Sequence, residues 1–187
     1  MHNLIKDRAV IGEDDWTLLR LQPAVAAAEG VEAQEGDKPE SITVPAGKVI
    51  VPLAVWQAQH ATLSQRKDVG VWLASDERPE ALKDDIERLE MIAVEFPKFA
   101  DGRGYSIAFN LRARHGYEGE LRAFGDVLRD QLFYMQRVGF NSFAVRPDRD
   151  VNDAIKGLSD FSESYQQSWD KKAPLFRRVH RQATVNK

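Results

Sequence analysis

Residues that could bind an anion are concentrated in one stretch, Lys98 to Ser106, which reads KFADGRGYS. Two glycines let the backbone turn tightly there, ahead of a segment with helical spacing of apolar residues. Free amides and the dipole at the start of a helix favour an anion, and Lys98 and Arg103 add positive charge. The sequence therefore predicts a site for an oxyanion such as sulfite, sulfate or phosphate. Its residues are Lys98, Asp101, Gly102, Arg103, Gly104, Tyr105 and Ser106. In the alternative interpretation, Asp101 only caps the helix and the glycines only form a turn.

A second group of polar residues follows the next apolar segments of the chain. Asp126 stands where a strand meets a helix, Arg129 falls one turn later, and Arg146 follows the last apolar segment. If all three face the same crevice as Arg103, opposed charges could position a polar ligand or a side chain of a partner. The alternative is ordinary electrostatics at the start of a helix, worth a few tenths of a kcal/mol.

Several kinds of chemistry find no support in the sequence. The chain contains no cysteine, which excludes thiolate metal sites, cysteine-ligated clusters and thiol redox chemistry within it. Neither a G-x-G-x-x-G fingerprint nor a phosphate-binding P-loop occurs. The four histidines, His2, His60, His115 and His180, are too scattered to predict a metal site or a serine triad. No catalytic residue and no cofactor is evident, so the residues alone name no reaction.

Length, charge and apolar content suit an ordinary globular domain. With 187 residues, 43% hydrophobic residues and a net charge of −3, the chain can bury one core. This charge gives no general attraction for nucleic acid or anionic lipid. The longest apolar run, Val49 to Trp56, is too short to span a bilayer, so we expect a cytoplasmic protein.

Strands and helices alternate in the pattern from residue 48 onward. Apolar runs predict strands at 49–53, 69–73, 91–96, 120–124 and 142–145. Amphipathic spacing predicts helices at 55–66, 79–89, 105–115, 127–138 and 151–167. About five βα units of this kind predict an α/β fold with a mainly parallel sheet. We favour an open doubly wound sheet, and a half-barrel-like curl is the alternative, because a full (β/α)₈ barrel takes about 250 residues.

The remaining segments flank these units. Two short apolar segments on either side of Gly12 to Asp15 predict a small N-terminal β-hairpin within residues 1–21. Residues 22–47 have no sustained period and predict a surface loop. We therefore expect a single domain over 1–170, with βα repeats at 48–168, followed by a charged C-terminal tail at 171–187.

Long strings in the sequence resemble a known bacterial family. The strings FPKFADGRGYS, GELRAFGDVLRDQ and the late pair Tyr165 and Gln166 are similar to the family called domain of unknown function 934. The resemblance covers nearly the whole chain, apart from a longer segment at Val31 to Ser41. Members of that family are commonly labelled probable oxidoreductases of sulfite reduction, and their genes typically lie beside those of sulfite reductase.

The resemblance implies a role in sulfur assimilation and cysteine biosynthesis. We expect an accessory protein of assimilatory sulfite reduction that acts with sulfite reductase or another sulfate-assimilation enzyme. The alternatives are a stand-alone α/β oxidoreductase, or other sulfur-metabolism enzyme, with an oxyanion-binding crevice, and an assembly partner without catalysis. The resemblance assigns no catalytic residue to this chain.

Overall fold

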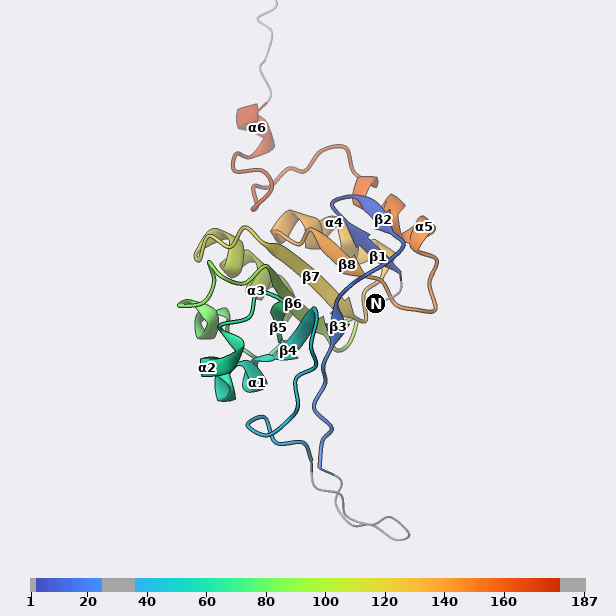
Figure 1. Cartoon of the computed structure of the whole chain (residues 1–187). Coiled ribbons are helices and arrows are strands. Elements are labelled where there is room, and N and C mark those ends of the chain that lie inside the picture. The colour runs from blue at the N-terminus through green and yellow to red at the C-terminus, as the bar shows by residue number, and fades with distance from the viewer. Residues whose placement is uncertain (1–2, 25–35, 179–187) are drawn as a thin grey trace, which may run out of the picture.

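The computed structural model describes residues 3–24 and 36–178. Its strands are β1 (Leu4–Lys6), β2 (Ala9–Ile11), β3 (Thr17–Leu18), β4 (Val49–Pro52), β5 (Val69–Leu73), β6 (Met91–Phe96), β7 (Glu120–Gly125) and β8 (Ser142–Ala144). Its helices are α1 (Leu53–Ala58), α2 (His60–Leu63), α3 (Arg103–Ala113), α4 (Arg129–Val138), α5 (Val151–Ala154) and α6 (Leu175–Arg178), with 3₁₀ turns η1 (Pro79–Leu82) and η2 (Ile155–Ser159). The protein is thus a mixed α/β fold, drawn in Figure 1.

All of these strands belong to one sheet, in the order β2-β1-β8-β7-β6-β5-β4-β3. Neighbours from β3 to β8 pair in parallel, whereas β1 pairs antiparallel with both β8 and β2. The sheet is therefore mixed and has eight strands, so the expectation of a mainly parallel sheet of about five strands is corrected. The additional strands are short segments near the N-terminus that lack a helix between them.

Within the part of the chain that the structure describes, helices α1 to α5 pack on one face of this sheet. Apolar side chains of α1 to α5, η1 and η2 join one large core cluster with the outward-facing strand residues. The second cluster consists of strand residues together with Trp16, and none of its members lies in a helix. A doubly wound sheet has helices on both faces and a reversal of strand order, whereas here β3 to β8 follow one another in sequence order. The sheet is a curled half-barrel, and the preference for a doubly wound sheet was wrong.

The N-terminal chain explains why the sheet must curl. Residues 12–16 connect β2 at one edge to β3 at the other. In a flat sheet the edges would be about 34 Å apart, since neighbouring strands are about 4.8 Å apart. The connection from Ile11 to Thr17 can span at most about 22 Å. This strap, residues 12–16, therefore crosses the concave face, as the blue chain between β2 and β3 shows in Figure 1.

The N-terminal hairpin differs in detail from the prediction. A hairpin of β1 and β2 is present, but its turn is at Asp7 and Arg8, which both have positive φ, 47° and 66°. Positive φ at both central positions is the geometry of a tight two-residue hairpin turn. Thr17 and Leu18 lie outside the hairpin and pair with β4 instead.

Two predicted helices are shorter than expected. Residues 79–89 form only the 3₁₀ turn η1 and further turns, with backbone bonds from Asp85 to Leu82 and from Arg88 to Asp85. Residues 151–167 are helical only as far as Ser159. An α-helix and a series of 3₁₀ turns both bury side chains that are three to four residues apart. The spacing of apolar residues therefore does not distinguish an α-helix from 3₁₀ turns.

The described parts of the flanking segments are partly anchored to the core. Ile42 and Val44 pack against the larger core cluster, and the side-chain amide of Gln59 donates to the backbone oxygens of Pro39 and Ile42. Toward the C-terminus, α6 stands away from the sheet in Figure 1. Among the described residues, no helix is both long and apolar enough to cross a membrane.

Candidate functional site

The carboxyl ends of β6 and β7 are joined by a close backbone contact at Gly125. Its φ is +100°, and a Cβ there would lie 2.4 Å from the carbonyl oxygen of Phe96, so only glycine fits. The next amide, that of Asp126, donates to the same carbonyl oxygen at 2.7 Å. The Asp126 carboxylate in turn accepts from the amide of Phe99 at 2.9 Å. The loop after β6 and the junction after β7 therefore meet at the carboxyl edge of the sheet.

Arg146, which follows β8, joins this group from the neighbouring strand. Its guanidinium donates to Asp126 at 2.9 Å and to Asp148 at 2.7 and 2.6 Å. The hydrogen bonds from Arg146 hold the pKa of Asp126 below its usual value and lower that of Asp148 to about 2. The same bonds raise the pKa of Arg146. One cation is thus shared between two carboxylates.

A second group links the loop after β6 to the end of β5. The Asp101 carboxylate accepts from the guanidinium of Arg103 at 3.0 and 2.7 Å and from the Ser75 hydroxyl at 2.8 Å. Arg103 also donates to the Ser75 oxygen at 2.7 Å. The hydrogen bonds from Arg103, and then that from Ser75, hold the pKa of Asp101 well below its ordinary range. Asp101 also accepts from the Arg103 amide at 3.1 Å, so it bonds the first amide of α3. The N-cap position itself is Gly102 and has no side-chain cap, so Asp101 is not the N-cap that the alternative interpretation expected.

The two glycines of this loop have different roles. Gly102 precedes α3 with an ordinary φ of −87°, so its position does not demand glycine. Gly104 is buried, and a Cβ there would lie 2.7 Å from the ring of Phe96. Tyr105 packs its ring 5.3 Å from that of Phe96 and 5.2 Å from that of Tyr134, and burial raises the pKa of its hydroxyl. Gly104 and Tyr105 therefore pack α3 closely against the strand β6.

The remaining predicted residues do not join these groups. Arg129 turns away to Asp153 and Asp160, at 3.1 and 3.2 Å. Lys98 and Ser106 are exposed. Since Arg103 and Arg146 already hold carboxylates, an oxyanion at this edge has to compete with Asp101, Asp126 and Asp148. Oxyanion binding here stays a prediction, which sulfite titration of Arg103→Ala by calorimetry would test.

The concave face of the sheet has a buried polar group whose residues were not among those predicted from the sequence. The Arg122 guanidinium, 1% exposed, makes a two-point contact with Asp14 of the strap at 2.8 and 3.1 Å. It also donates to Glu120 at 2.7 Å and to the Ser142 hydroxyl at 3.2 Å, and Lys6 lies 2.6 Å from the other oxygen of Glu120. Burial alone would raise the pKa values of Asp14 and Glu120, but Arg122 is the largest of the opposing influences, and both pKa values are lowered. This group joins the strap to the middle of the sheet.

A second polar contact lies nearer the carboxyl end of the same face. Arg20 contacts Glu95 at 2.8 Å, and its guanidinium carbon lies 5.6 Å from the Trp72 ring and 5.5 Å from that of Phe124. Burial raises the pKa of the nearby Glu77, and the charge of Glu95 adds to the effect. The polar residues of this face could have been found from the sequence. Glu120, Arg122 and Glu95 interrupt otherwise apolar strands, and every second residue of a strand points to the same face.

A comparison with known protein families gives a match. The profile of a bacterial protein family of unknown function (DUF934) matches residues 70–176. This range is 107 of the 187 residues, counted from 70 to 176, and is more than half of the chain. The chain belongs to this family. A search of curated proteins found no match.

The family match contains both groups of the carboxyl edge, and it begins inside β5. Asp14 and the strap precede it, so the ion pair with Arg122 joins a segment outside the matched range to one within it. Within the described residues, no group of three or more histidine or acidic side chains is arranged to hold a metal ion.

Proposed function

We propose that this protein is an accessory protein of assimilatory sulfite reduction that binds sulfite reductase. The pathway comes from the family resemblance of FPKFADGRGYS and GELRAFGDVLRDQ, both of which lie in the matched range. The proposed mode of action, binding to another protein, rests on a single observation. Large aromatic side chains are exposed next to one another on the side of the sheet that the helices cover.

This aromatic surface consists of Phe109, Tyr134, Tyr165 and Phe176, whose exposed fractions are 39, 52, 69 and 64%. Phe109 and Tyr134 line a groove between α3 and α4, and Tyr165 and Phe176 line a second hollow in the C-terminal segment. Gln167 lines both, so the two hollows adjoin. Contiguous exposed apolar surface rimmed by polar residues is typical of protein interaction sites, and aromatic residues are enriched there.

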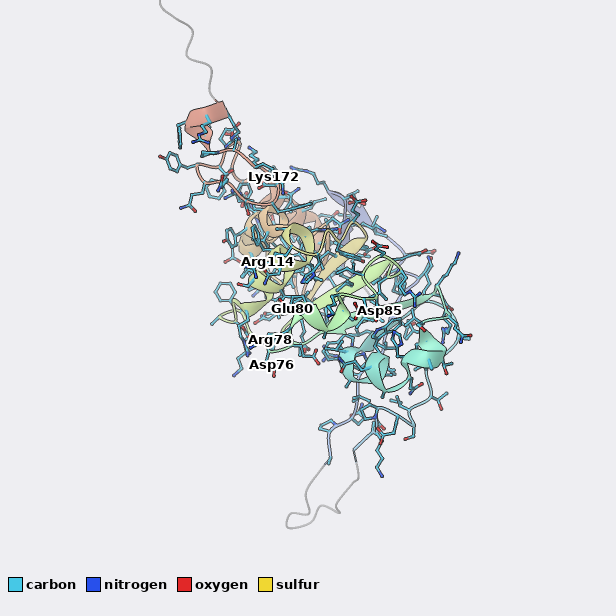
Figure 2. All side chains as sticks on the ribbon, turned by 90° about the vertical axis from the view of Figure 1, so that its left-hand side faces the viewer. Asp76, Arg78, Glu80, Asp85, Arg114 and Lys172 are labelled. Atoms are coloured by element: carbon cyan, nitrogen blue, oxygen red, sulfur yellow. The ribbon has the colours of Figure 1, made fainter. Side chains whose placement is uncertain are left out.

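The rim of this surface is basic. Arg114 lines the groove and Arg177 the second hollow. Lys172 lies with its ammonium 3.6 Å from the centre of the Trp169 ring. Figure 2 shows Arg114 and Lys172 on the side of the molecule that faces the viewer. The chemistry therefore suits an acidic patch on the partner, because opposite charges steer association.

Growth on sulfate tests the pathway. Cells that lack the gene should grow poorly with sulfate as the sole sulfur source and normally with cysteine. A plasmid copy of the gene should restore growth, and a copy with Phe109→Ser and Tyr134→Ser should not. Normal growth of the deletion strain on sulfate would contradict the pathway assignment.

Purification separates the accessory role from the alternative of a stand-alone oxidoreductase. The accessory role predicts that the protein isolated from its natural host has no visible absorption band of its own. A bound flavin or haem spectrum in stoichiometric amount would instead establish an enzyme in its own right.

A further inference from the structure

A cavity on the side of α4 that faces the chain after η2 has a lining rich in hydrogen-bond donors. It has a volume of about 500 Å³ and lies between α4, the hairpin turn at Arg8 and residues 158–171. Its cations are Arg8, Arg137 and Lys171, against one acidic side chain, Asp170. It is distinct from the carboxyl edge and from the aromatic surface, with which it shares no lining residue.

Two buried donors of this cavity have no hydrogen-bond partner within the described part of the chain. These are Nε of Arg137 and Oγ of Ser164, in residues that are only 8 and 7% exposed. Asp170 forms an ion pair with Arg137, with its carboxylate 3.5 Å from that Nε but without a hydrogen bond. The Nη2 of the same guanidinium donates to the Gln166 carbonyl, so Nε is the part of Arg137 that lacks a hydrogen-bond acceptor. Buried donors without a partner are rare because each loses its bond to water, so each calls for an acceptor such as a ligand, an ion or a buried water.

Of the other two cations, Arg8 is weakly engaged, whereas Lys171 forms an ion pair with a carboxylate outside the lining. Arg8 makes two long contacts, at 3.4 Å, to the side-chain oxygen of Gln136 and to the Leu158 carbonyl. Lys171 is 3.0 Å from Glu163, which does not line the cavity. Residues with guanidinium, ammonium and hydroxyl donors line one space, and such donors match the acceptor oxygens of an oxyanion.

We propose that this cavity binds an oxyanion group, either free sulfate, sulfite or phosphate, or the phosphate of a larger molecule such as a nucleotide. Arg137, Arg8 and Ser164 are its donors. The larger molecule is included because the cavity has the volume of an ordinary ligand pocket, and because Phe133 and Phe161, with ring centres 5.0 Å apart, line it. The proposal does not depend on the assignment to sulfite reduction.

Isothermal titration calorimetry of the full chain with sulfate, sulfite, phosphate, adenosine and adenosine monophosphate tests this proposal. Ser164→Ala removes a hydroxyl without a partner, so it should leave the fold intact while weakening anion binding about tenfold, the effect of losing one charge-assisted hydrogen bond. Arg8→Gln should weaken binding by a similar or larger factor. Arg88→Gln, an equal charge change at a 55% exposed side chain near η1, is the matched control and should bind like the wild type.

The arms of the titration distinguish the two sources of the anion. Tighter binding of the nucleotide than of phosphate, with none of adenosine alone, would identify an esterified phosphate. Equal binding of phosphate or sulfate and the nucleotide would identify the free anion. The proposal is overturned if no anion binds, or if Ser164→Ala and Arg8→Gln bind as tightly as the Arg88→Gln control.

Discussion

Asp14 and Arg122 are 108 positions apart and form a two-point ion pair, at 2.8 and 3.1 Å, with side chains only 3 and 1% exposed. The pair holds the strap against the middle strand of the concave face. Because the strap also connects the two edges of the sheet, this contact couples the edges to the centre. The half-barrel curl and the N-terminal chain therefore depend on each other.

Removing the Asp14 carboxylate should destabilise the protein strongly. Asp14→Ala leaves the buried guanidinium of Arg122 with Glu120 as its neighbouring carboxylate, and breaking a buried pair costs about 3 kcal/mol or more. Urea unfolding measures the loss. The adjacent Asp15→Ala is the matched control, since Asp15 pairs with Lys48 while 71% exposed and should cost less than about 1 kcal/mol. Equal losses for the two variants would contradict the role of the strap.

Protonation of the carboxylates that contact Arg122 should also lower the stability of the protein in acid. The folded-state pKa values of Asp14 and Glu120 are lowered from ordinary values of 3.8 and 4.5. Their contribution is therefore fully present above those ordinary values and is lost as the pH falls through the lower, folded values. Thermal unfolding from pH 7 to pH 2 should show a smaller acid loss in Asp14→Asn than in the wild type. Parallel pH profiles would exclude Asp14 as a source of the acid sensitivity.

Gly125→Ala should disrupt the contact between β6 and β7. A Cβ at this position would lie 2.4 Å from the Phe96 carbonyl oxygen and would require φ of +100°, so we expect a loss of about 2 kcal/mol or more. Gly12→Ala is the control, because nothing lies within 4 Å of a Cβ there. Chemical denaturation compares the two, and similar stability of both variants would refute the packing argument.

The parallel strands β4 to β8 could be predicted from the sequence to within about one residue. Runs such as Met91 to Phe96 are apolar, rich in strand formers and ended by a residue such as Pro97 that cannot continue the ladder. The curl could not be predicted in this way. It depends on Thr17 and Leu18 pairing with β4 and on Asp14 meeting Arg122, which are contacts between distant segments.

The candidate site could likewise be predicted only where it depends on strand order, and not where it depends on contacts between distant segments. Asp126 and the loop after β6 meet because both follow neighbouring parallel strands, and strand order alone predicts that. Arg129 was expected there but points to Asp153 and Asp160, because its helix turns it toward α5 and η2. The donor-rich cavity brings together Arg8, Arg137 and Ser164 from three separate segments, and no local pattern signals that.

Binding to sulfite reductase tests the central claim of the proposed function most directly. The purified full chain should bind the sulfite reductase haemoprotein in biolayer interferometry, and Phe109→Ser with Tyr134→Ser should weaken that binding at least tenfold, about 1.4 kcal/mol. Val10→Ser is the matched control, since Val10 is also 39% exposed but lies on the edge strand β2. The proposal predicts that this control binds like the wild type. No binding by the wild type, or equal binding by the aromatic double variant, would contradict it.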